Sequence, residues 1–495
     1  MSDKRKVAYS LPFFISLSVV IGMFVGFRLR DGFPDAPFFP RKTTSPVQEV
    51  LQLIENNYVD EVSTKTIGDS AIEALLTKLD PHSIYIPPAE LSDINDEIRG
   101  QFYGVGIEFA IYRDTVQVLQ VLDDGPADRA GLKVGDQILK VGEKKVSGVQ
   151  VLEDSLRSAL RGRSEAPVAI QLLRGNKLIN VPVKRGMITI NSIESAYMIN
   201  EKTGYILLTK FTTETYREFM EALTDLKSKG MENLIFDLRG NGGGILSEAV
   251  DIVDEFLSGD KLITYTEGKH QPKKEYRCRR EGQFETGKLM VLCDDESASA
   301  SEIVLGALQD WKRATIVGER SFGKGLVQEQ YDLQNGGALR LTVARYFTPI
   351  GRSIQRPYKQ DREAYFSRHD MNDSLAKGGI RPDVKVDRST MIFADSTGRF
   401  SEFEKLKEWS YRYVQSHPEL AERFKDAKQL DQTLTITPTD WNGILPQPQN
   451  KMTESYLNQQ VKAFIGGMIL GKSAFYPIQH KQDLYVQEAL RQLSK

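Results

Sequence analysis

The spacing of apolar residues changes along the chain, and each spacing predicts a different kind of element. Residues 7–27 form an apolar run without charges. A helix of that length would extend about 32 Å, enough to cross a membrane core of about 30 Å. Lys4, Arg5 and Lys6 precede the run, which favours a cytoplasmic N-terminus. The alternative is a cleaved signal peptide, but no A-x-A site follows the run.

We therefore expect residues 1–6 to be a cytoplasmic tail, residues 7–27 an uncleaved transmembrane anchor, and residues 28–45 a Pro- and Arg-rich linker. The rest of the chain would then lie outside the cytoplasm. In a bacterium, this predicts a single-pass protein of the cell inner membrane whose main part is periplasmic.

A helical period begins after the linker and predicts an N-terminal helical region over residues 46–95. Residues 96–186 alternate like strands and carry Gly-rich turns. Over residues 187–390, apolar strands such as NLIFDL alternate with helices such as ILSEAVDIVDEFL, which predicts α/β layers around a largely buried sheet. Residues 391–495 are helical again. We expect an α/β multidomain protein whose C-terminal helices pack on the N-terminal helices, with packing on the core, a dimer surface or an adaptor site as alternatives.

Composition excludes several classes of function. Lys and Arg number 65 and Asp and Glu number 67. The net charge of -2 argues against electrostatic binding of nucleic acid by the chain as a whole. Only 2 cysteines and 5 scattered histidines are present, without an HExxH motif. This argues against a disulfide scaffold and a catalytic metal. We expect no cofactor.

Three short segments of the α/β region carry candidate chemistry. They are the glycine loop 238–244, the segment SASASE at 297–302, and Gly323-Lys324-Gly325 with Gln328 after it. Each has a simpler interpretation: a tight turn or a dinucleotide site, a helix cap with small residues, and a surface lysine. Residues 318–324 also fit the start of a phosphate-binding loop, but Gly325 replaces the required Ser or Thr and a strand follows instead of a helix.

Together, the three segments favour acyl transfer. A serine at the start of a helix can attack a carbonyl when a base takes its proton. A lysine can be that base if burial lowers its pKa, and apolar neighbours of Lys324 provide such a setting. Gln328 could orient the amine without holding it charged. Backbone N–H groups in the loop at Gly244 and at Ala300 are candidates for the oxyanion hole.

These segments resemble the C-terminal processing peptidases, or tail-specific proteases, which are serine proteases with a Ser-Lys dyad. The resemblance runs from about residue 46 to 387. It includes LDPHSIYI (79–86), FYGVGIEF (102–109), residues 123–141, DLRGNGGG (237–244), SASASEIVLGAL (297–308), GERSFGKGLVQ (318–328) and GIRPDVKV (379–386).

The resemblance implies Ser299 as nucleophile, with Ser297 and Ser301 as alternatives, and Lys324 as general base. It implies Gln328 as the assisting residue, with Gly244 and Ala300 as oxyanion donors. The fold that it implies for residues 187–390 is a protease core like caseinolytic protease and crotonase.

Residues 96–186 resemble a PDZ domain. The segment FYGVGI and the segment GPADRAGLKVGD are typical of such domains. Closely spaced glycines let successive N–H groups bind the carboxylate of a C-terminus while the peptide adds as a strand. We expect the substrate-binding residues to be Gly104, Val105, Gly106 and Ile107. The alternative is a small barrel that binds nothing. The resemblance also implies that a bound tail activates the protease.

The sequence thus predicts a membrane-anchored periplasmic serine endopeptidase that recognises protein C-termini and cleaves tails through an acyl-enzyme. The expected partners are proteins or peptides with free C-termini and the membrane, but not nucleic acid. The sequence leaves open an adaptor or a homo-oligomer. The alternatives are a catalytically silent PDZ scaffold that binds protein C-termini and, from the phosphate-binding pattern, a nucleotide-dependent enzyme.

Overall fold

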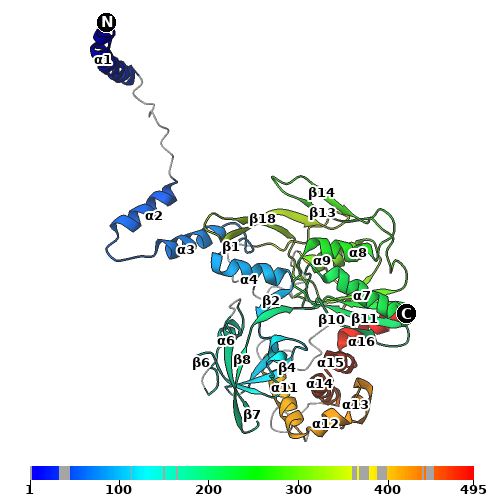
Figure 1. The fold of residues 1–495 in the computed structure, drawn as a ribbon. Helices are drawn as coiled ribbons and strands as arrows, with labels where there is room; N and C mark the ends of the chain where they lie inside the picture. Colours follow the sequence, from blue (N-terminus) through cyan, green and yellow to red (C-terminus); the bar gives the residue numbers. More distant parts are fainter. Residues whose placement is uncertain are drawn as a thin grey trace. The chain divides into compact units, whose positions relative to one another are not determined.

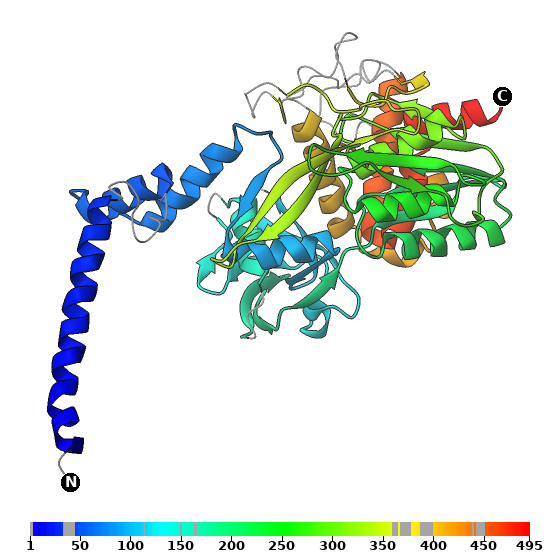
Figure 2. The same cartoon turned by 90° about the horizontal axis from the view of Figure 1, so that it is seen from above.

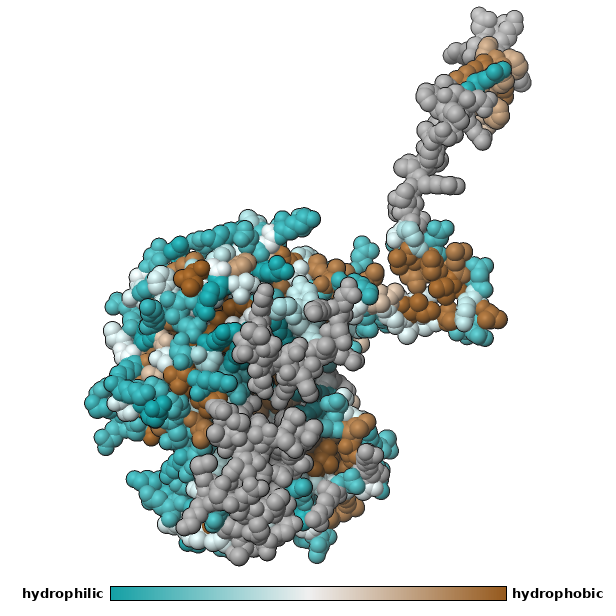
Figure 3. Space-filling view, turned by 180° about the vertical axis from the view of Figure 1, so that it is seen from behind, coloured by the Kyte–Doolittle hydropathy of each residue, from teal (hydrophilic) through white to brown (hydrophobic). Residues whose placement is uncertain are grey.

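The chain divides into two compact units, residues 1–72 and 73–495 (Figures 1 and 2). In this computed structural model, the described residues are 3–32, 45–112, 114–148, 151–162, 166–358, 365–366, 378–386, 399–437, 440–441 and 451–495. The first unit contains α1 (Asp3–Gly32), α2 (Pro46–Asn57) and the start of α3 (Thr64–Leu76). No residue of α2 is buried, and its apolar residues Val47, Val50 and Leu53 are exposed. Figure 3 shows hydrophobic surface, in brown, gathered on this helix.

The expected anchor at residues 7–27 lies within the helix α1. Within the part of the chain that the structure describes, no helix is long and apolar enough to cross a membrane. The prediction of a transmembrane helix therefore finds no support in the structure. Most of the expected linker, residues 33–44, lies outside the described residues, and residues 28–32 belong to α1.

An antiparallel sheet forms the core of the region that was expected to be a PDZ domain. Its strand order is β3 (Ile107–Tyr112), β4 (Thr115–Val121), β5 (Gln137–Val141), β7 (Val168–Arg174) and β8 (Lys177–Val183), with β6 (Lys144–Lys145) paired to β5. One apolar cluster joins the sheet to α6 (Glu153–Leu160) and α5 (Pro126–Arg129) and contains Val116 and Val118 of β4, Val168, Ile170 and Leu172 of β7, Leu156 and Leu160 of α6 and Ala127 of α5. Strand β3 ends the strand order and is therefore an edge of the sheet.

A six-stranded, mostly parallel sheet organises the region that was expected to be a protease core. Its strand order is β10 (Ile193–Met198), β11 (Thr203–Leu208), β12 (Asn233–Asp237), β15 (Leu289–Cys293), β16 (Thr315–Gly318) and β19 (Val384–Lys385). Only β10 runs antiparallel to its neighbour in this sheet. A parallel sheet is covered on both faces, so its strands read as continuous apolar runs.

The two faces of this sheet are covered by different helices (Figure 1). Ile206 and Leu208 of β11 belong to the core formed with α7 (Thr215–Ser228), α8 (Leu246–Asp254) and α9 (Ala300–Asp310). Tyr205 and Leu207, which point the other way, pack against α16 (Leu484–Leu493). The last helix of the chain therefore packs on the core sheet, which was one of the alternatives, and not on the N-terminal helices.

A second sheet contains Gln328, on a strand that begins two residues after Lys324. It has the order β1 (Ile84–Ile86), β18 (Ala338–Phe347), β13 (Leu262–Glu267) and β14 (Lys274–Arg277), and β17 (Leu326–Asp332) also pairs with β18. The yellow-green ribbon of β17 and β18 is the long hairpin in Figure 2. The pair β2 (Gln101–Gly104) and β9 (Gly186–Thr189) lies at the two ends of the PDZ-like segment, and α4 (Pro88–Ile98) precedes it.

The remaining C-terminal helices have their own apolar core. They are α11 (Arg399–Ser416), α12 (Glu419–Arg423), α13 (Ala427–Thr433), α14 (Lys451–Leu470) and α15 (Lys472–Gln479). Phe424, Trp441 and Val461 are fully buried among them. The C-terminal region therefore has two parts, a helical cluster and α16 on the six-stranded sheet.

Candidate active site

Ser299 lies on a strained turn between strand β15 and helix α9. It is the N-cap residue of α9, with φ 56° and ψ −113°. A positive φ is unfavourable for a residue with a Cβ, and such strain is typical of functional turns. The Ser299 hydroxyl donates no hydrogen bond to the described residues.

The two neighbouring serines are in a different state. Ser297 and Ser301 are fully buried. The Ser297 hydroxyl donates to the carbonyl of Leu238 at 2.8 Å, and the Ser301 hydroxyl donates to the carbonyl of Asn241 at 2.9 Å. A buried hydroxyl that is already bonded to a carbonyl is a poor nucleophile. The geometry therefore favours Ser299 among the three candidates.

The glycine loop lies against the Ser299 turn because β12 and β15 are parallel neighbours, so their carboxyl ends meet at one edge of the sheet. A Cβ added to Gly243 would lie 2.6 Å from the carbonyl oxygen of Ala298 and 2.8 Å from Cβ of Ser299. A Cβ on Gly244 would lie 2.0 Å from the carbonyl oxygen of Phe211. Only glycine permits this approach, and both residues have φ values in the region that favours glycine.

The two predicted oxyanion donors remain available. The N–H groups of Gly244 and Ala300 donate to no acceptor among the described residues, whereas adjacent N–H groups are bonded. Gly243 N donates to Oδ1 of Asn241 at 2.9 Å, and Ser301 N donates to the carbonyl of Ala298 at 3.1 Å. Two unpaired backbone donors beside a serine can stabilise the negative oxygen of a tetrahedral intermediate.

Lys324 lies in the connection between β16 and β17, where it is partly buried. Burial, and secondarily the positive charge of Arg340, lower the pKa of the Lys324 amine. Its Nζ forms no hydrogen bond or ion pair with another described residue, the Ser299 hydroxyl included. Catalytic hydrogen bonds are often long without substrate and tighten only in the complex. The environment thus favours the neutral amine that a general base requires.

The backbones of Ser299 and Lys324 are joined by a buried carboxylate that the sequence analysis did not assign. Oε2 of Glu302 accepts from Ser299 N at 2.9 Å and from Lys324 N at 2.8 Å. Its Oε1 accepts from Ser321 Oγ at 2.6 Å and from Gly323 N at 2.7 Å. Burial raises the pKa of the Glu302 carboxyl, and these four hydrogen bonds oppose that rise. A capping pattern, Ser followed three residues later by Glu, could have identified the first contact but not the second.

A tyrosine makes a second link between the same two residues. The hydroxyl of Tyr346 on β18 lies 2.9 Å from the carbonyl oxygen of Ser299 and also contacts the carbonyl oxygen of Lys324. Tyr346 is buried, which raises the pKa of its hydroxyl well above the ordinary value and keeps it a hydrogen-bond donor. Nothing in the local sequence around Tyr346 indicates this role, because the contact depends on how β18 lies beside the turn.

Gln328 lies on β17 and makes a contact that the sequence did not predict. Its side-chain amide donates to the carbonyl of His82, and it forms no hydrogen bond with Lys324 among the described residues. His82 belongs to the LDPHSIYI segment, whose turn is held by hydrogen bonds from the N–H groups of His82 and Ser83 to Oδ1 of Asp80. This segment therefore supports the strand that carries Gln328.

The predicted carboxylate-binding loop lies at the start of the edge strand β3. The carbonyl of Val105 accepts from Ala127 N at 2.8 Å, and the carbonyl of Gly106 accepts from Leu122 N at 3.0 Å. The N–H groups of Val105 and Gly106 donate to no acceptor within the described chain. Gly104 ends β2 and Ile107 begins β3. Unpaired donors beside an open sheet edge suit a peptide that adds as a strand.

Comparisons with known proteins match the two halves of this site. Peptidase family S41 matches residues 202–386, and a PDZ domain matches residues 104–184. A carboxy-terminal-processing protease of Bartonella bacilliformis is 34% identical over 313 residues, which are 62% of this chain and 71% of the relative. A CtpA-like serine protease of Staphylococcus saprophyticus is 29% identical over 380 residues, 74% of this chain and 77% of the relative. The solved photosystem II D1 C-terminal processing protease is 27% identical with a TM-score of 0.40, covering 68% of this chain and 92% of that one.

Proposed function

The chain belongs to peptidase family S41 and is a serine-type peptidase with a PDZ domain, and we propose that it binds free protein C-termini through this domain and cleaves the tails with a Ser-Lys dyad. One observation carries the proposal. The unpaired hydroxyl donor of Ser299 lies in the turn that also holds the unpaired N–H of Ala300, against the glycine loop with Gly244. A nucleophile beside two backbone donors is the arrangement that acyl transfer needs.

In this mechanism, the neutral amine of Lys324 takes the proton from Ser299 Oγ as Oγ attacks the carbonyl carbon of the scissile bond. The N–H groups of Gly244 and Ala300 donate to the oxygen that becomes negative. Collapse of the intermediate breaks the C–N bond, and the Lys324 ammonium returns its proton to the leaving amine. Water then attacks the acyl ester, with Lys324 again as base, and Ser299 is restored.

Lys324 has to come within hydrogen-bond reach of Ser299 for this reaction. Glu302 and Tyr346 hold the two backbones together, and we propose that a side-chain movement of Lys324 completes the dyad. We propose that the free Oε1 side of Gln328 orients the amine in that state. We also propose that a tail bound at Gly104, Val105, Gly106 and Ile107 favours it.

The test uses two test proteins that differ only in their last residues, one with an apolar tail and one with a charged tail. Parent enzyme should shorten one in preference to the other, whereas Ser299→Ala and Lys324→Ala should cleave neither. Ser301→Ala is the matched control, because its hydroxyl is bonded to the Asn241 carbonyl and takes no part in the reaction. Cleavage by Ser299→Ala at the parent rate would reject the proposal.

Two further expectations stay proposals. The location outside the cytoplasm is supported by the basic residues before the apolar run 7–27, and protease accessibility in intact spheroplasts tests it. The likeness of the core to caseinolytic protease and crotonase is supported by the alternation of parallel strands and helices. The alternative of a silent PDZ scaffold would require an impaired site, whereas a serine, an amine with a lowered pKa and two unpaired donors are all present.

A further inference from the structure

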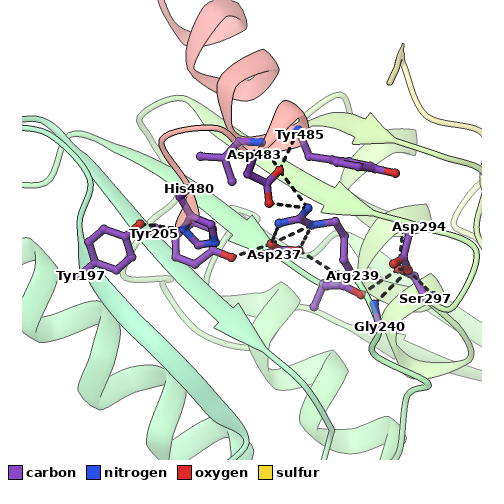
Figure 4. A network of polar contacts seen from close by, with 12 residues as sticks. Tyr197, Tyr205, Asp237, Arg239, Gly240, Asp294, Ser297, His480, Asp483 and Tyr485 are labelled. Carbon is purple, nitrogen blue, oxygen red and sulfur yellow. Dashed lines mark hydrogen bonds and ion pairs between the residues drawn. The ribbon is translucent and has the colours of Figure 1, made fainter. Parts of the chain in front are cut away.

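Arg239, near the start of the glycine loop, is held by two carboxylates that lie far from each other in the sequence (Figure 4). Nη2 of Arg239 lies 2.6 Å from Oδ2 of Asp237, which is the last residue of strand β12. Nη1 of Arg239 lies 2.9 Å and 3.1 Å from the two carboxylate oxygens of Asp483, 244 positions away in the sequence. The side chains of Arg239 and Asp483 are only 18% and 13% exposed. The pair is therefore poorly screened by solvent.

Asp483 is itself held rigidly by the C-terminal helix. It is the N-cap of α16, and its Oδ1 accepts from Tyr485 N at 2.9 Å and from Val486 N at 3.2 Å. Tyr485 and Val486 pack into the sheet core, and the Tyr485 ring lies 4.7 Å from Cζ of Arg239. Burial acts to raise the pKa of Asp483, but the positive charge of Arg239 and the hydrogen bonds to the Asp483 carboxylate outweigh burial and lower it. Asp483 is thus an ionised anchor on a packed helix.

The backbone of Arg239 continues into the part of the glycine loop that carries the Gly244 N–H. Gly240 N donates to Oδ1 of Asp294 at 3.0 Å, and the Ser297 hydroxyl oxygen lies 3.1 Å from the same carboxylate oxygen (Figure 4). The carbonyl of Asn241 accepts from Ala298 N at 3.0 Å. The backbone between Arg239 and Gly244 is therefore tied to the nucleophile turn on one side and, through Arg239, to α16 on the other.

We propose that Asp483, contributed by helix α16, is a positioning residue for the oxyanion hole. By holding the guanidinium of Arg239, it fixes the glycine loop so that the Gly244 N–H faces the carbonyl of the substrate. Asp483 lies outside residues 202–386, which match the peptidase family, so the C-terminal helix completes a site that this region alone leaves unsupported. The inference rests on the proposed function, because it concerns a donor for that reaction.

The test is Asp483→Asn in the full chain. Asparagine keeps a side-chain oxygen for the N-cap, so α16 should still form, but it removes the charge that holds Arg239. Removing an oxyanion donor outright costs about 10²–10³-fold in kcat, and a displaced donor should cost about 10–100-fold. We expect kcat for a peptide substrate to fall by about 10–100-fold while KM changes by less than about 2-fold.

A second measurement reports on the oxyanion hole without turnover. A peptide aldehyde adds to Ser299 and places its oxygen in the hole, so its affinity should fall in Asp483→Asn by the same factor as kcat/KM. Asp483→Glu keeps the charge and should recover part of the loss. Glu488→Gln is the matched control on α16, since Glu488 pairs with Arg491 and does not contact the glycine loop. It should keep the parent kcat.

The outcomes are distinct. Parent kcat and parent aldehyde affinity in Asp483→Asn would overturn the inference. The inference would also be overturned if Asp483→Asn and the parent had the same rate per titratable Ser299. Asp483 would then contribute to stability alone. If the parent cleaves no tail but aldehyde affinity still falls in Asp483→Asn, the substrate proposal fails and the positioning role stands.

Discussion

The contact between the glycine loop and the nucleophile gives a sharp prediction for Gly243→Ala. The new Cβ would lie 2.6 Å from the carbonyl oxygen of Ala298, 2.8 Å from Cβ of Ser299 and 2.9 Å from the N atom of Ala300. These are backbone or Cβ atoms, which cannot turn aside as the end of a long side chain can. An ordinary C···O contact is about 3.3–3.6 Å, so the loop and the Ser299 turn must separate by roughly 0.7 Å or more.

This separation acts on both catalysis and stability. A displacement of about 1 Å in a catalytic arrangement can cost about 10²-fold, so kcat/KM should fall by about 10²-fold, or about 2.7 kcal/mol of transition-state stabilisation. Gly243 also has φ 97°, which alanine tolerates poorly. Leaving the favoured region costs about 1–2 kcal/mol, so the free energy of unfolding should fall by at least that amount.

Gly242→Ala is the control, because nothing lies within 4 Å of a Cβ at Gly242 and its φ is not positive. The assay is hydrolysis of a peptide substrate at rates normalised to folded enzyme, with urea unfolding of each variant alongside. Gly242→Ala should keep the parent rate. Equal rates for the two variants would refute the argument that the loop and Ser299 are in close contact.

Three further predictions follow from contacts around the site. Arg340→Gln removes a positive charge that lowers the pKa of Lys324, so this pKa should rise. The acid limb of the kcat/KM profile should then move to higher pH, since a protonated amine accepts no proton. The exposed Arg345→Gln on the same strand should leave the profile unchanged. Tyr346→Phe should lower the free energy of unfolding by about 1–3 kcal/mol and reduce kcat, because the Ser299 and Lys324 carbonyls lose a buried donor. Urea unfolding and turnover assays measure the two effects. The control Tyr331→Phe should change neither quantity, because Tyr331 is exposed. Gly106→Ala should weaken binding of a peptide with a free C-terminus in fluorescence anisotropy, because its Cβ would lie 3.1 Å from Cδ1 of Ile188. Gly142→Ala, with a similar positive φ but open space, should not; equal weakening by both would contradict the loop assignment.

The candidate site was predictable from the sequence where chemistry depends on short segments. The serines of SASASE, the lysine between two glycines and the glycine loop each specify a local conformation, and together they match a family. The strand and helix periods of residues 187–310 were equally readable, because burial on both faces leaves continuous apolar strands. At Gln328 the same approach was incomplete, since the partner of its amide is the carbonyl of His82, 246 positions away.

The sequence alone determined which residues could react: a serine at a helix start, an amine among apolar neighbours, and glycines that let N–H groups face a substrate. These properties are local, because they follow from side-chain chemistry and from allowed φ values over a few residues. Tertiary structure alone decided which serine is left without a bonded acceptor, how Glu302 and Tyr346 join Ser299 to Lys324, and that Asp483 of the last helix holds Arg239. Such contacts depend on the order of strands in the sheets and on the helices that cover them, which bring together residues that no short segment contains.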